Sequence, residues 1–102
     1  MTLERRLAAL AAAGETITYG ELARELGLRM AELTAGLEAL MEQDLRAGAP
    51  LRAVLVRQRL SPHQSPAPGF FLKAAELGRP DVDVEAERRA LFASPPPFTS
   101  AP

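Results

Sequence analysis

The 102-residue chain contains no cysteine and only one histidine, His63. Without cysteine it cannot form a disulfide, attack a substrate through a thiolate or build a cysteine zinc site. Small secreted domains often depend on disulfides, so their absence favours a reducing compartment, and we expect the protein to be cytoplasmic. The N-terminus lacks the pattern of a signal peptide, and no apolar stretch reaches the ~18 residues that span a bilayer, which predicts no membrane partner.

The same shortages restrict catalysis. His63 falls in a segment rich in Pro and Ser, and neither a second histidine nor a cysteine is available to share a metal ion with it. Ser61 and Ser65 lie too close to it in sequence, with no orienting acid nearby, to form a nucleophilic triad. The glycines are explained by helix starts, helix ends or packing, so no nucleotide-binding loop is indicated. We predict that the chain is not an enzyme and uses no metal or cofactor, although its carboxylates alone leave a hydrolase open.

Local signals predict three helices in the first half. Apolar residues at helical spacing between Thr2 and Gly14 predict a helix over about 3–13. The segment Thr18-Tyr19-Gly20-Glu21 has the pattern of a capping box, in which Thr18 and Glu21 each accept from the other's amide, and it predicts a helix over 19–26. A third apolar stripe predicts a helix over about 30–46. Gly36 in its middle indicates close packing against one of the other two helices.

The second half is predicted to contain a β-hairpin and short helices. The segment 51–57 is expected to be one strand and 69–72 the other, followed by short helices that end near Phe92. The fold class is therefore α+β, a winged helix-turn-helix in a single domain over 1–93, with a Pro-rich disordered tail over 94–102. The predicted core consists of Leu7, Leu10, Ile17, Tyr19, Leu22, Leu26, Leu33, Leu37, Leu40, Val54, Val56 and Phe70.

Positive charge is concentrated in the middle of the chain. Residues 1–44 contain eight acids and four arginines, whereas residues 45–75 contain five basic residues and no acid. Such a stretch indicates either a positive binding face or a solvated strand edge that discourages edge pairing. The predicted third helix has a net negative charge, which disfavours its insertion into a major groove of DNA.

The segment Ile17-Thr18-Tyr19-Gly20-Glu21-Leu22-Ala23, with Gly27 and Gly36 at matching distances, resembles the C-terminal winged-helix domain of the alkylguanine-DNA alkyltransferases. The chain also looks like a family of small bacterial proteins that share this start and a Pro-x-x-Gly-Phe segment. The alkyltransferase likeness covers roughly residues 17–60 and implies a DNA-binding fold in which Tyr19 is retained.

This chain departs from the alkyltransferase pattern at the residues that perform the chemistry in that family. Arg57 stands where that family has its nucleophilic cysteine, and Gln58 stands where it has the neighbouring histidine, while Arg59 is kept. Leu33 replaces the helix arginine that fills the gap left by a flipped base. Because the alkyl acceptor must be a thiolate, the resemblance does not extend to alkyl transfer.

Two functions follow as predictions. The first is nucleic-acid binding through a basic wing within residues 45–75, with DNA as the partner. The residues predicted to make the contacts are Tyr19, Arg46, Arg52, Arg57, Arg59 and Lys73. The alternative is a non-enzymatic interaction or regulatory module that binds a protein partner or a second copy of itself and no nucleic acid. Convergence of the basic residues on one face would favour the first, and their pairing with acids beside an exposed apolar patch would favour the second.

Overall fold

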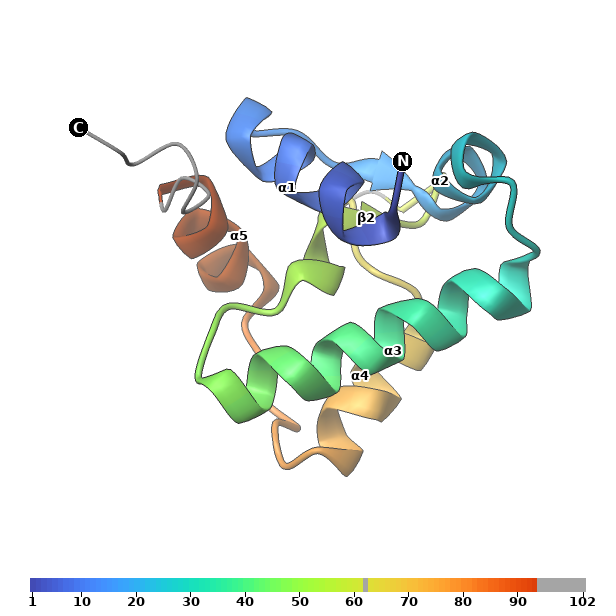
Figure 1. The fold of residues 1–102 in the computed structure, drawn as a ribbon. Coiled ribbons are helices and arrows are strands. Elements are labelled where there is room, and N and C mark those ends of the chain that lie inside the picture. The colour runs from blue at the N-terminus through green and yellow to red at the C-terminus, as the bar shows by residue number, and fades with distance from the viewer. Residues whose placement is uncertain (62, 94–102) are drawn as a thin grey trace.

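The computed structural model describes residues 1–61 and 63–93, so the predicted tail over 94–102 lies outside the described residues. The elements in chain order are α1 (Leu3–Ala13), β1 (Ile17–Thr18), α2 (Tyr19–Leu26), α3 (Met30–Ala47), the 3-10 turn η1 (Arg52–Leu55), β2 (Val56–Arg57), α4 (Pro68–Glu76) and α5 (Val84–Ala93) (Figure 1). Helices dominate and a small two-stranded sheet accompanies them, which confirms the broad α+β class.

The three N-terminal helices begin and end close to the predicted residues because local capping groups determine their ends. Thr2 Oγ1 accepts from the Arg5 amide at 3.2 Å, and Gly14 ends α1 with a φ of 69°. Thr18 Oγ1 accepts from the Glu21 amide at 3.2 Å, as the capping box predicts. The reciprocal bond differs from the prediction, since the Glu21 carboxylate accepts from the Thr18 hydroxyl at 2.9 Å.

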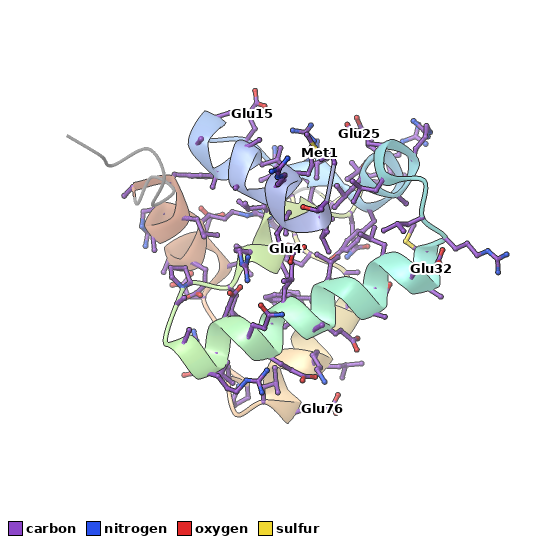
Figure 2. The ribbon with its side chains drawn as sticks, in the orientation of Figure 1. Met1, Glu4, Glu15, Glu25, Glu32 and Glu76 are labelled. Carbon is purple, nitrogen blue, oxygen red and sulfur yellow. The ribbon has the colours of Figure 1, made fainter. Side chains whose placement is uncertain are left out.

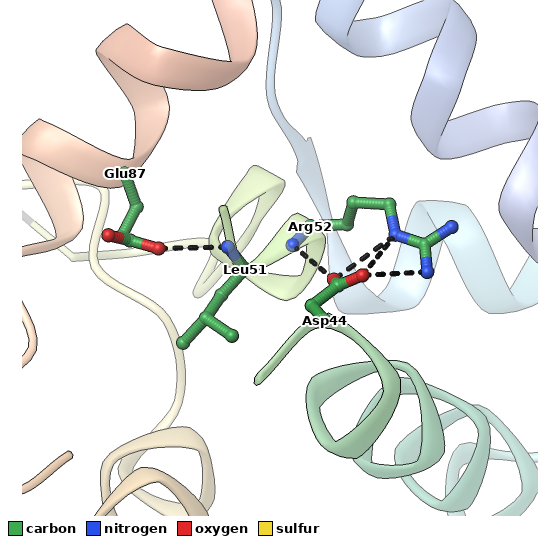
Figure 3. A network of polar contacts seen from close by, with 4 residues as sticks. All are labelled: Asp44, Leu51, Arg52 and Glu87. Atoms are coloured by element: carbon green, nitrogen blue, oxygen red, sulfur yellow. Dashed lines mark hydrogen bonds and ion pairs between the residues drawn. The ribbon is translucent and has the colours of Figure 1, made fainter. Parts of the chain in front are cut away.

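The predicted first strand of the hairpin is wrong over residues 52–55, which form η1 instead. The Leu51 amide donates to Glu87 Oε1 at 2.8 Å, and the Arg52 amide donates to Asp44 Oδ2 at 3.0 Å (Figure 3). Two side-chain carboxylates thus take amides that a strand ladder would need. The backbone then closes on itself, with the Val54 amide donating to the Leu51 carbonyl at 3.2 Å.

The predicted second strand is also wrong, because residues 69–72 lie inside α4. Pro68 begins this helix at a position where no amide donor is needed, and Phe70 and Ala74 are buried one turn apart. The sheet that does form is parallel rather than a hairpin, with Ile17 opposite Val56 and Thr18 opposite Arg57. Neither strand of the predicted wing pairs with the other in the described residues.

The core surrounds η1, which contacts α1, α3 and α5. The residues predicted to be buried are buried, except that Tyr19 and Leu26 are only partly so. The expectation for Gly36 is confirmed, because a Cβ at this position would lie 3.1 Å from Leu3 Cδ2 of α1. Figure 1 shows α3 running below α1 with α4 beneath it, which leaves one side of α3 facing α4.

Candidate functional site

Two of the predicted DNA-contacting residues form ion pairs with acids of α3. Arg52 Nη2 lies 2.8 Å from Asp44 Oδ1, and the Asp44 residue is 4% exposed. Lys73 Nζ lies 2.9 Å from Glu42 Oε2. The hydrogen bond and the charge of this second pair lower the pKa of Glu42 and raise the pKa of Lys73. Two acids of α3, the helix predicted to have a net negative charge, therefore neutralise part of the basic segment.

The other predicted site residues have different environments. Arg57 is half-buried, and its Nε donates to Thr16 Oγ1 at 3.0 Å. Arg46 and Arg59 are exposed. The Tyr19 hydroxyl accepts from the Ala67 amide at 2.8 Å, and burial raises the pKa of this phenol. Tyr19 is therefore a structural anchor for the segment that leads into α4.

An apolar pocket of about 250 Å³ lies between α3 and the start of α4. Its α3 wall is one face of that helix, since residues spaced by three and four positions lie above one another. That wall is made of Met30, Thr34, Leu37, Glu38 and Met41, and the remaining lining residues are Tyr19, Ala53, Ala67, Gly69 and Phe70. Met30 is 49% exposed whereas Met41 is 1% exposed, so the lining runs from the surface into the core.

One charged residue of the pocket lining, Glu38, belongs to a cluster of acids around Lys73. Glu38 lines the pocket, and it lies close enough to Lys73 to raise the pKa of that residue together with Glu42 and Glu76. Figure 2 shows Glu76 beside α4, away from Glu15 near the end of α1. Three carboxylates surround one ammonium group, and Arg46 is close enough to Glu42 to lower its pKa, so acids outnumber bases in this cluster by three to two. We call this set, Glu38, Glu42, Glu76 and Lys73, the acidic rim.

The sequence analysis predicted neither the pocket nor the burial of Arg88 on α5. Leu37 was predicted to be buried and is buried, but an apolar stripe does not reveal where the neighbouring helix leaves a gap. Arg88 is 7% exposed. Its burial had a signal in the sequence, because Val84, Arg88 and Leu91 lie at the spacing of one helix face.

Among the described residues, no group of His, Asp and Glu side chains is placed to hold a metal ion. No helix in that part of the chain has the length and apolar character needed to cross a membrane. Comparison with known proteins finds no family model, curated protein or solved structure that matches the chain. The resemblance to the alkyltransferase domain therefore stays a prediction.

Proposed function

We propose that the chain is a non-enzymatic protein-interaction module whose binding site is the pocket between α3 and α4. The pocket receives an apolar side chain from a helical partner segment, and the acidic rim contacts Lys or Arg residues that flank this side chain. The observation that carries the proposal is an apolar lining that includes Glu38, a member of the cluster of three acids around Lys73.

The size of the pocket suits one or two side chains. Its volume of about 250 Å³ lies just below the range of roughly 300–1,000 Å³ that is usual for small-molecule sites. Burying one Leu or Phe side chain contributes about 1.5–3 kcal/mol, which corresponds to roughly 10- to 150-fold in affinity. An amphipathic helix that lays its apolar face into a groove uses contacts of this kind.

The acidic rim determines the charge of the partner. Exposed charges interact over about one Debye length, roughly 8–10 Å at physiological salt. Carboxylates at Glu38 and Glu76 therefore attract a basic flank and repel an acidic one, mainly through the association rate. The expected partner segment is apolar on one face and rich in Lys or Arg beside it.

A protein partner has more support than nucleic acid. Arg52 and Lys73 are paired with acids, and the hairpin expected to present the basic wing does not form in the described residues. We propose in addition that α2 and α3 are a helix-turn-helix of winged-helix type without its wing. The short turn that joins them, over residues 27–29, supports this relationship. The lack of cysteine supports a cytoplasmic protein.

The test is binding of a designed helical peptide with leucines on one face and lysines beside them. Its control peptide has glutamate in place of each lysine. We expect the lysine peptide to bind and Glu38→Lys to weaken it by about 1 kcal/mol, or roughly fivefold. Glu15→Lys makes the same charge change near the end of α1 and should leave the affinity unchanged. Absence of saturable binding, or equal losses in both variants, would contradict the proposal.

A further inference from the structure

The guanidinium of Arg88 is a buried cation held by neutral groups. Its Nε donates to the Val54 carbonyl at 2.8 Å, and its Nη2 donates to the Gln64 carbonyl at 2.7 Å. No carboxylate within the described part of the chain forms an ion pair with it. The charge of Glu85, one turn earlier on α5, acts to raise the pKa of Arg88. Buried charges are usually paired, so within residues 1–61 and 63–93 this positive charge has no ion-pair partner.

One nitrogen of Arg88, Nη1, has no hydrogen-bond partner in the described part of the chain. Within residues 1–61 and 63–93, Nη1 makes no hydrogen bond, and no fully buried side-chain nitrogen there is without a partner. Arg88 lines a surface pocket of about 250 Å³ between the end of α1 and α5, and this pocket is the space to which Nη1 can open.

The surroundings of that pocket favour an anion. Its lining consists of Gly14, Thr16, Gln64, Glu85, Arg88, Arg89 and Phe92. Arg57 adds a further positive charge, since its Nε is bound to Thr16 Oγ1 at 3.0 Å. Burial lowers the pKa of Arg88, the carboxylate of Glu85 opposes this effect, and the charge of Arg57 lowers the pKa by a smaller amount. Three guanidinium groups thus lie in or beside a pocket that contains the carboxylate of Glu85.

We propose that this pocket binds a small phosphomonoester with an aromatic or apolar body. A dianionic phosphate would offset the repulsion between Arg57 and Arg88 and accept hydrogen bonds from Arg88 Nη1 and from Arg89. Phe92, 37% exposed at the pocket, offers an apolar contact to the rest of the ligand. The proposal is independent of the pocket between α3 and α4, because the two pockets share no lining residue.

The experiment is a titration of the isotope-labelled full chain, followed by NMR at constant ionic strength. The probes are phenyl phosphate, inorganic phosphate and phenol. We expect saturable shifts of the Gly14, Thr16 and Gln64 amides with both phosphates, tighter binding of phenyl phosphate, and no shift with phenol. Phe92→Ala should remove the preference for phenyl phosphate. Absence of saturable shifts with phenyl phosphate, or equal shifts with phenol, would overturn the proposal.

Variants of Arg57 and Arg89 test the proposed phosphate contacts while the buried Arg88 stays unchanged. Arg57→Gln keeps a donor for Thr16, and Arg89→Gln changes an exposed side chain. Neither variant is therefore expected to unfold the chain. Each should weaken phenyl phosphate binding by roughly fivefold or more, as expected for loss of one charge at short range. Arg5→Gln removes an exposed charge outside the pocket and is the matched control. Equal weakening by Arg5→Gln would show a nonspecific charge effect and overturn the proposal.

Discussion

Replacing Asp44 with alanine should destabilise the fold by about 3 kcal/mol, because this carboxylate joins the end of α3 to η1. Asp44 is 4% exposed and accepts the Arg52 amide at 3.0 Å and the Arg52 guanidinium at 2.8 Å (Figure 3). Without the carboxylate, a part-buried amide of the turn loses its acceptor and the guanidinium loses its counter-charge.

The magnitude is the sum of two contributions. A hydrogen bond to a charged acceptor contributes about 1.5–3 kcal/mol. The ion pair is partly screened, since the Arg52 side chain is 28% exposed, and we assign it about 1 kcal/mol as for surface pairs. Arg52→Ala should therefore cost only about 1 kcal/mol, because the hydrogen bond from the backbone amide of residue 52 to Asp44 stays intact. Asp44→Asn keeps an acceptor without the charge and should fall between the two.

The assay is urea unfolding followed by circular dichroism, with free energies of unfolding for the two single variants and the double variant. The double variant should be as stable as Asp44→Ala, since the hydrogen bond from the backbone amide to Asp44 does not depend on the arginine side chain. If Asp44→Ala and Arg52→Ala differ by less than about 0.5 kcal/mol, the carboxylate–amide bond does not hold η1 and the explanation for the missing strand fails.

Three further predictions concern Gly36 and Tyr19. Gly36→Ala should change the stability of the native chain little, because a gain of about 1 kcal/mol in helix propensity is offset by displacement of Leu3. In a Leu3→Ala background the same substitution should stabilise the fold by the full amount of about 1 kcal/mol. Equal gains in stability in both backgrounds would contradict the close contact. Tyr19→Phe should cost about 1–2 kcal/mol in urea unfolding by leaving the Ala67 amide unpaired, and an unchanged stability would contradict the bond. The pKa of Tyr19, the single tyrosine, should lie above that of the urea-unfolded chain in an absorbance titration, so stability should stay level below the unfolded value of about 10 and fall as pH rises past it; a folded pKa at or below the unfolded one would refute this.

Short-range signals in the sequence account for the N-terminal helices. Thr2, Thr18 and the glycines that follow each helix act on the backbone within a few residues, so their effect can be inferred without the fold. The Gly36 contact was also foreseeable in kind, since a glycine inside a helix often marks close packing.

The hairpin could not be rejected from the sequence, because the groups that prevent it come from distant elements. Segment 51–56 is apolar enough for a strand, yet its first two amides donate to Glu87 of α5 and to Asp44 of α3. The apolar pocket and the environment of Arg88 likewise depend on how separate elements pack. Residue types along the chain indicated basic charge in 45–75, but the neutralising acids lie on α3.

The most direct test of the proposed binding site uses the methionine methyl groups as probes. Met30 and Met41 line the pocket between α3 and α4, whereas Met1 is outside it and 81% exposed. In a methyl NMR titration with the lysine peptide, Met30 and Met41 should shift together and saturate while Met1 stays in place. Shifts confined to Met1, no shift at Met41, or the same Met30 and Met41 shifts with duplex DNA instead of the peptide would contradict a protein-binding pocket.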